Sequence, residues 1–352
     1  MRILVPAILL MLLVFACNSE PETSTPSGDS TTAPRETEAA AKPRASTLHP
    51  RDSLNLLIEK EGASAELLLA RARLHLGYQN VDAARNDLNR VIQMDSSIAE
   101  LHELKGELHY MINQTRVARD EWQKCIELDP ENSVCLMKLA ELLIAARNYD
   151  RALKLVNRQL EIDENDPQAY FAKGIIVRDR FQDTALALQY FQNALDLKED
   201  YFEAMDMIAV TLTARRDTFA RFYYDRMLEM RPNDASTYFK LGVYYMNMGE
   251  INRALESYTR AVQLNPSDAD SYYNLAFMHV ELKQYQEARK YFTRAIQVQD
   301  RNYKAYYGRG YTFEVVGDIA NARRDYEKAI EILPVYKPAG EALARLNRQY
   351  QE

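Results

Sequence analysis

A self-similar pattern with a period of 34 residues runs from Ala65 to Tyr336 and constrains the fold of this 352-residue chain more than any other feature. Each unit contains two stretches in which apolar residues recur at helical spacing, separated by a turn. Repetition at such a period is typical of solenoids, in which each unit buries its apolar face against its neighbours. The sequence therefore predicts an all-α solenoid of helical hairpins. Its eight units begin near residues 65, 99, 133, 167, 202, 235, 269 and 303.

Small residues recur at two fixed places in every unit, and a large residue follows the second of them by four positions. Two antiparallel helices approach closely only where the side chains at their crossing are small, and large residues fill the gaps beside the crossing. Proline between units prevents the second helix from continuing. The eighth places hold Ala72, Gly106, Ala140, Gly174, Ala209, Gly242, Ala276 and Gly310; the twentieth places hold Ala84, Ala118, Ala152, Ala187, Ala220, Ala254, Ala288 and Ala322; the large residues are Leu88, Trp122, Val156, Phe191, Tyr224, Tyr258, Phe292 and Tyr326; the prolines are Pro130, Pro232, Pro266 and Pro334.

Two units depart from the period. The fourth has one extra residue in its inner turn, around residues 179–183, and the fifth has one fewer, around residues 214–217, so the register recovers. Gln159 and Met227 stand where the pattern prefers alanine, which predicts looser packing at these two positions.

The ends of a solenoid must be closed, because the terminal units have a neighbour on one side only. We expect an N-terminal capping helix over residues 53–64 and a C-terminal capping helix over residues 337–352. The apolar side of the second cap consists of Ala339, Ala342, Leu343 and Leu346.

The repeated small and large residues make the chain similar to tetratricopeptide repeat (TPR) proteins, and the resemblance covers residues 65–336. It implies a right-handed superhelix whose concave surface is lined by the first helix of each unit. It also implies a non-enzymatic protein that binds other proteins and needs no cofactor or metal ion. In outline, the chain is similar to repeat lipoproteins that serve as adaptors in the bacterial envelope.

In the TPR family, places 2, 5, 9 and 12 of each unit face the concave surface, and carrying them over divides that surface in two. Residues 65–201 include 17 basic and 23 acidic residues, whereas residues 202–336 include 18 of each. The acidic set consists of Glu66, Glu100, Glu103, Glu107 and Glu141, with Arg73, Leu69, Met137 and Ile144 beside it. The apolar set consists of Phe171, Phe239, Val243, Met246, Tyr273, Phe277, Tyr307 and Tyr311, with Ile175 and Val280 beside it.

An exposed row of aromatic residues indicates a binding site, because such a row is unfavourable in water unless another molecule covers it. We expect a segment of a partner protein to place apolar side chains on the apolar set and basic side chains on the acidic set. Three alternatives stay open. The rings could contribute stability alone, the surface could bind a carbohydrate or glycopeptide, or the chain could associate with itself.

The first residues resemble the signal peptide of a bacterial lipoprotein. Arg2 precedes an apolar stretch over residues 3–16 that is too short for a comfortable membrane span. This stretch leads into "VFAC", which resembles the lipobox, so the resemblance implies a signal peptide over residues 1–16 and lipidation of Cys17, with palmitate among the expected acyl chains. A plain secretory signal with an incidental Cys17 is the alternative.

Residues 17–52 are rich in serine, threonine and proline and contain no aromatic residue. Such a segment cannot bury enough apolar surface to offset the entropy of ordering it, so we expect a disordered tether. Together with a lipid anchor it predicts a location in the bacterial cell envelope, at the outer membrane rather than the inner one. The partners would be other envelope proteins or peptides.

Signatures of catalysis are not found in the sequence, which has no phosphate-binding loop, no nucleophile elbow and no paired metal-binding cysteines. His75, His109 and His279 all stand at the eleventh place, an apolar slot, and we expect them in the core. The net charge of −7 argues against nucleic acid as a partner. We expect Cys125 to be a buried free thiol; a disulfide with Cys135 is the alternative in an oxidising envelope.

Overall fold

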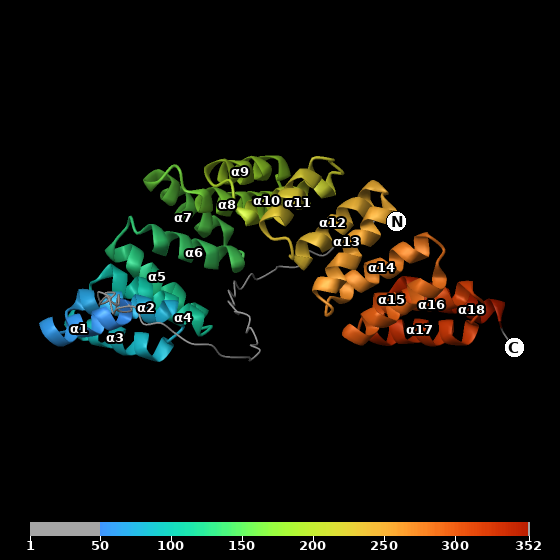
Figure 1. Ribbon diagram of the computed structural model, residues 1–352, viewed down its shortest axis with the longest axis horizontal. Coiled ribbons are helices and arrows are strands. Elements are labelled where there is room, and N and C mark those ends of the chain that lie inside the picture. The colour runs from blue at the N-terminus through green and yellow to red at the C-terminus, as the bar shows by residue number, and fades with distance from the viewer. Residues whose placement is uncertain (1–49, 351–352) are drawn as a thin grey trace, which may run out of the picture. The chain divides into compact units, whose positions relative to one another are not determined.

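The computed structural model describes residues 50–350, which form eighteen α-helices and, within that range, no strand (Figure 1). The predicted signal peptide, Cys17 and the tether up to residue 49 lie outside the described residues, so the expectations for them stay predictions. No helix within residues 50–350 combines the length and the apolar character that crossing a bilayer requires.

Eight helical hairpins follow one another in chain order, and every first helix begins at the residue where the 34-residue pattern places it. The first helices are α2 (Ala65–Gly77), α4 (Ala99–Met111), α6 (Ser133–Ala145), α8 (Pro167–Ile176), α10 (Phe202–Ala214), α12 (Ala235–Met248), α14 (Ala269–Glu281) and α16 (Tyr303–Val315). The second helices are α3 (Val81–Met94), α5 (Thr115–Leu128), α7 (Tyr149–Ile162), α9 (Thr184–Leu197), α11 (Ala220–Met230), α13 (Ile251–Leu264), α15 (Tyr285–Val298) and α17 (Ile319–Ile332).

Contacts run between neighbouring units, as a solenoid requires. Each second helix contacts the first helix of its own hairpin and the first helix of the next one. First helices of successive units also contact each other directly in the pairs α2 with α4, α6 with α8, α10 with α12 and α14 with α16. The predicted all-α architecture is confirmed.

The small and large residues of the repeat form the core. All eight alanines at the twentieth place and all eight large residues that follow them are at most 2% exposed. The glycines at the eighth place have a steric reason. A Cβ atom on Gly106 would lie 2.3 Å from Nε1 of Trp122, and one on Gly174 would lie 2.5 Å from the ring of Phe191. Glycine therefore lets the largest rings pack against the backbone of the first helix.

Each hairpin turn contains one residue in the left-handed region, with φ between 56° and 84°. Glycine occupies this position in two units only, as Gly249 and Gly317. The extra residue of the fourth unit is accommodated by a π-helical turn, η1 (Val177–Phe181), which ends at Gln182 with φ 56°. The residue missing from the fifth unit coincides with a shorter second helix, since α11 has 11 residues where most second helices have 14.

Single helices flank the hairpins at both ends. The first, α1 (Pro50–Glu61), starts and ends three residues before the expected cap. It ends at Glu61 because the next residue, Gly62, has a φ of 88°, which is outside the helical region. The last, α18 (Lys337–Gln349), buries three of its four expected apolar residues, Ala339, Ala342 and Leu346, while Leu343 is half-buried.

Candidate functional site

The aromatic residues at the fifth place of four units have the same environment. Each lies on a first helix, is half-buried, and packs against a buried ring on the second helix of its own hairpin. One side of each ring is therefore fixed by the core, while part of the ring stays accessible to solvent. The ring centroids are 5.6 Å apart for Phe171 and Phe191, 5.8 Å for Phe239 and Tyr258, 5.7 Å for Tyr273 and Phe292, and 5.6 Å for Tyr307 and Tyr326.

The other members of the apolar set are less uniform. Val243, Met246 and Phe277 are half-buried and pack against the same core, whereas Tyr311 is 37% exposed. Burial raises the pKa of Tyr273 to about 12, so its hydroxyl is protonated at neutral pH. The structure thus places the apolar set on four first helices, α8, α12, α14 and α16, and its binding of a partner stays a prediction.

Two tyrosines that the repeat pattern did not single out extend this arrangement. Tyr201 precedes α10 and lies 5.2 Å from the ring of Phe171. Tyr336 precedes α18 and lies 5.6 Å from the ring of Tyr307. Both are the last residue of their unit, stand one residue before the next helix, and pack on the fifth-place ring of their own unit. That shared place is the signal by which the sequence could have identified them.

The acidic set is partly neutralised. Arg73 pairs with Glu100 at 2.7 Å and with Glu103 at 3.2 Å, and Glu103 is 7% exposed and also accepts a hydrogen bond from Asn132. The hydrogen bond with Glu100 raises the pKa of Arg73, which keeps this cation charged. Only Glu66, Glu107 and Glu141 of the acidic set are exposed.

Two apolar residues that we expected beside the acidic set belong to the core. Leu69 is 3% exposed and Met137 is 5% exposed, so neither offers a surface for a partner. Both side chains pack within the apolar cores of the first units, so the expectation was wrong for these two positions. Ile144, in contrast, is half-buried.

The histidines at the eleventh place are not core residues, which corrects the expectation. His109 and His279 are half-buried near the ends of their helices, and each donates a hydrogen bond from Nδ1 to a glutamine in the following turn, Gln114 or Gln284. His75 is half-buried as well. These bonds tie the first helix to the hairpin turn, so their role is local and structural.

A partly buried ionic cluster lies between α4 and α5. Glu121 contacts Lys105 at 2.5 Å and Nδ1 of His102 at 2.6 Å, while Nε2 of His102 faces the carbonyl oxygen of Ser96 at 3.0 Å. Both ring nitrogens of His102 thus face acceptors. Burial opposes ionisation of Glu121, but the hydrogen bonds from Lys105 and His102 outweigh it and lower its pKa.

We expect this cluster to make the second unit sensitive to acid. A carboxyl group whose pKa is lower in the folded state stabilises the fold above its unfolded pKa of about 4.3. That stabilisation is lost as the pH falls through the folded pKa. Glu121→Gln should therefore lower the free energy of unfolding at pH 7 by about 1–3 kcal/mol and flatten its dependence on pH below 5. Urea unfolding between pH 7 and pH 3 measures both effects. Glu127→Gln, an exposed position on the same helix, should leave the acid limb unchanged.

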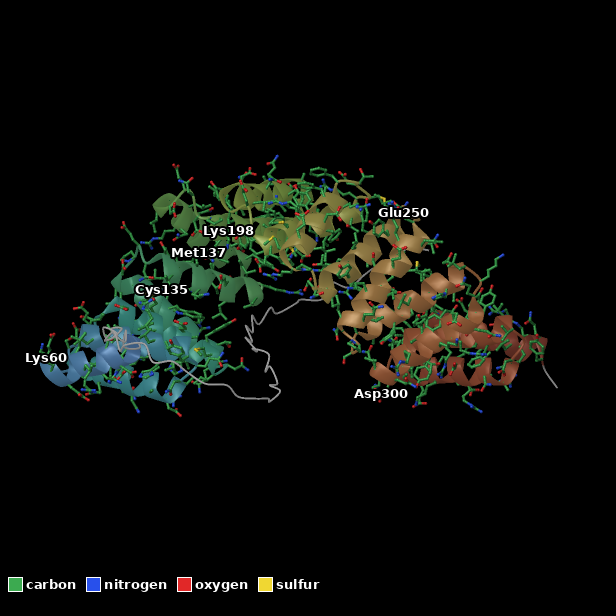
Figure 2. The ribbon with its side chains drawn as sticks, viewed as in Figure 1. Lys60, Cys135, Met137, Lys198, Glu250 and Asp300 are labelled. Carbon is green, nitrogen blue, oxygen red and sulfur yellow. A yellow bond between two sulfur atoms is a disulfide. The ribbon has the colours of Figure 1, made fainter. Side chains whose placement is uncertain are left out.

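Cys125 and Cys135 form a disulfide, so the expectation of a free thiol was wrong. Cys125 lies in the last turn of α5 and Cys135 in the first turn of α6, and their Cα atoms are 6.4 Å apart, within the range that a disulfide spans. Both residues are fully buried, as expected for Cys125. Figure 2 labels Cys135 on α6 beside Met137. The bond covalently joins the second unit to the third.

Within residues 50–350, no group of three or more histidine, cysteine, aspartate or glutamate side chains could hold a metal ion. Chemistry at the apolar set is limited to packing and hydrogen bonding, because its polar atoms are tyrosine hydroxyls.

Family models match three stretches of the chain. Tetratricopeptide repeat models match residues 114–173 and 267–334, and the model of subunit 3 of the anaphase-promoting complex, or cyclosome, matches residues 216–295. A TPR repeat-containing protein of Methanocaldococcus jannaschii is 25% identical over 114 residues, which is 32% of this chain and 20% of that protein. This chain therefore spans about a fifth of that relative, and the likeness concerns the repeats.

Solved structures show the same architecture. The C-terminal part of a TPR repeat-containing protein from Cytophaga hutchinsonii has a TM-score of 0.55 at 17% identity, covering 68% of this chain and 99% of that one. YrrB, a TPR protein with an unusual peptide-binding site, has a TM-score of 0.44 at 24% identity, covering 52% and 95%. The family models support the identification of the chain as a TPR repeat protein, and the Cytophaga match shows the solenoid fold. This fold commonly mediates protein–protein interactions.

Proposed function

We propose that the chain is a non-enzymatic scaffold of the bacterial cell envelope that binds a segment of another protein on the concave surface of its TPR solenoid. The observation that supports this most is the row of half-buried rings at the fifth place of four units. Each ring is backed by a buried ring at 5.6–5.8 Å, so it is held in one orientation. Preordered aromatic residues lose little entropy on binding and are frequent at the centres of interfaces.

The exposed carboxylates and the rings lie in different units, and this separation indicates which kind of residue the two ends of a bound partner segment should carry. Glu66, Glu107 and Glu141 lie in the first three units, whereas the rings lie in the fourth and in the last three. A partner with apolar residues at one end and lysine or arginine at the other would match both parts. We therefore expect binding to weaken as salt screens the exposed carboxylates.

Location in the envelope is supported from two sides. The sequence has a lipobox-like "VFAC" that ends in Cys17, followed by a segment suited to a tether. A buried disulfide between Cys125 and Cys135 is typical of proteins that fold in an oxidising compartment. We place the anchor at the outer membrane rather than the inner one.

A variant of the apolar set tests this function. Replacing Phe239, Tyr273, Phe277 and Tyr307 by alanine in the full-length chain is expected to reduce capture of partners from detergent-solubilised envelope at least tenfold, since it removes the centre of the interface. Tyr311→Ala tests the same surface without disturbing the core, because this ring is the most exposed of the set. Val117→Ala, an exposed position on a second helix, serves as the matched control.

Each alternative predicts a different outcome for these variants. If the four-alanine variant unfolds and Tyr311→Ala binds as the unchanged chain does, the rings contribute stability alone. If capture depends on glycans and is insensitive to salt, the surface binds carbohydrate. If the captured species is the chain itself and the sedimenting mass rises with concentration, the solenoid associates with itself.

A further inference from the structure

A groove of about 700 Å³ lies on the other side of the hairpins, between the second helices α9 and α11. We call it the outer groove. Its aromatic side consists of Phe219, just before α11, and of Phe222 and Tyr223 in the first turn of α11. Its other side includes Asp196 near the end of α9 and Glu199 two residues after that helix. Figure 2 labels Lys198, the residue that follows α9.

Phe219 and Phe222 form an exposed aromatic surface. They are 54% and 46% exposed, and their rings stack with centroids 5.1 Å apart and an interplanar angle of 11°. Tyr223 is 6% exposed and meets both rings edge-on at 5.5 Å and 5.4 Å, and its hydroxyl donates a hydrogen bond to Gln192 at 3.0 Å. The stacked pair therefore rests on a fixed base and is ordered without a partner.

The fifth unit differs from the other seven at these two places. Phe219 and Phe222 stand at places 19 and 22 of the repeat, which face solvent on the second helix. No other unit has an aromatic residue at either place. The corresponding pairs are Ala83 and Asn86, Val117 and Asp120, Arg151 and Lys154, Leu186 and Gln189, Arg253 and Glu256, Glu287 and Lys290, and Asn321 and Arg324. Solenoid packing therefore does not require rings here.

Two carboxylates and one guanidinium, those of Asp196, Glu199 and Arg226, line the outer groove. Within residues 50–350, neither Asp196 nor Glu199 forms an ion pair, and both are exposed. Arg226 also lines the groove, where it donates a hydrogen bond to the backbone carbonyl of Glu199 at 2.9 Å and lies 5.9 Å from the centre of the Phe222 ring, so the two carboxylates outnumber this one cation. The ammonium group of Lys198 lies 5.2 Å from the centre of the Tyr201 ring.

We infer that the outer groove is a second binding site, which takes an extended peptide segment with a proline or aliphatic anchor next to a basic residue. Aromatic surfaces of this kind recognise proline-rich segments, whose preformed extended conformation loses little entropy on binding. The carboxylates of Asp196 and Glu199 select the basic residue by charge complementarity. The inference goes beyond the proposed function, because it concerns the second helices and a different occupant.

Labelled twelve-residue peptides test this site by fluorescence anisotropy with the full-length protein. One set carries Pro-Leu-Pro followed by arginine after zero to three serines; matched sets replace arginine by glutamate or the anchor by Ser-Ser-Ser. The arginine set should bind saturably, and each replacement should weaken binding about tenfold. Phe219→Ser with Phe222→Ser should lose at least tenfold in affinity. Asp196→Asn with Glu199→Gln should lose about threefold to tenfold and most of the salt dependence.

Two controls separate this site from the concave surface. Val117→Ser changes an exposed second-helix residue in another unit, and Tyr311→Ala changes the apolar set; both should bind the peptides as the unchanged chain does. The carboxylate variant alters exposed side chains only, so it keeps the test informative if the double serine variant is destabilised. The inference is overturned if no arginine peptide binds below millimolar concentration, if glutamate peptides bind equally well, or if Tyr311→Ala abolishes binding.

Discussion

Replacing Trp122 by alanine is expected to lower the free energy of unfolding by about 3–5 kcal/mol. The side chain is 2% exposed and packs over Gly106, and its ring lies 5.7 Å from that of Tyr110. Its removal leaves a cavity that the rigid helices around it cannot close. Urea unfolding followed by far-ultraviolet circular dichroism measures the loss. Because each unit contacts only its neighbours, hydrogen exchange should rise in α4 and α5 before it rises in α14 to α17.

The partner of Trp122 in this contact gives the control. A Cβ atom on Gly106 would lie 2.3 Å from the indole nitrogen, so Gly106→Ala should destabilise by about 1–3 kcal/mol. Gly340→Ala, in a helix with no atom within 4 Å of the added carbon, should be neutral or stabilise by up to about 1 kcal/mol. Gly106→Ala combined with Trp122→Leu recreates the Ala72 and Leu88 pair of the first unit. If the double variant loses as much stability as Gly106→Ala and Trp122→Leu lose in sum, the clash between the added Cβ atom and the indole ring is not the cause of the destabilisation in Gly106→Ala.

The hairpins were predictable because their packing is encoded within one repeat. The small residue of the first helix and the large residue of the second meet inside the same unit, as Gly174 and Phe191 do, so 34-residue spacing suffices to locate them. The start of each first helix follows from the same register. The extra residue of the fourth unit was visible as a count, but the count did not show that Val177–Phe181 would form a π-helical turn.

Contacts between units were harder to predict. The expectation that Cys125 is buried was correct, but its bond to Cys135 depends on the distance between α5 and α6, which no pattern within a unit supplies. The same holds for Glu103. It forms an ion pair with Arg73 of the preceding unit and accepts a hydrogen bond from Asn132, which lies in the turn before the next unit. The repeat pattern predicts on which face of its helix a residue lies. How much of its side chain remains exposed depends on contacts with residues of the neighbouring units.

The two candidate surfaces differ in how the sequence reveals them. The apolar set depends on a family rule for which places face inward, and the structure adds that Phe239, Tyr273 and Tyr307 are backed by buried rings. The outer groove needs no such rule. Phe219 and Phe222 are departures from the chain's own repeat at positions where the other units are free of rings, and this contrast can be read directly once the register is known.

Removing the disulfide is expected to lower the free energy of unfolding by about 3 kcal/mol, because closing a loop of ten residues restricts the unfolded chain by that amount. The loop contains the turn between the second and third units, so the bond also prevents these units from separating when one of them opens. The test compares Cys125→Ala with Cys135→Ala against the unchanged pair, both in a Cys17→Ser background that leaves no other cysteine.

Unfolding in urea with and without a reductant distinguishes the contribution of the covalent bond to stability from the contribution of the packing of the two cysteine side chains. Both sulfur atoms belong to fully buried residues, so the reductant must be present throughout unfolding to reach them. It should lower the stability of the disulfide-bonded protein close to that of the double alanine variant and leave the variant unchanged. Two thiols alkylated in the unreduced, denatured protein would contradict the bond itself. If the bond forms but its removal changes stability by less than about 1 kcal/mol, the inter-unit contact alone holds α5 against α6.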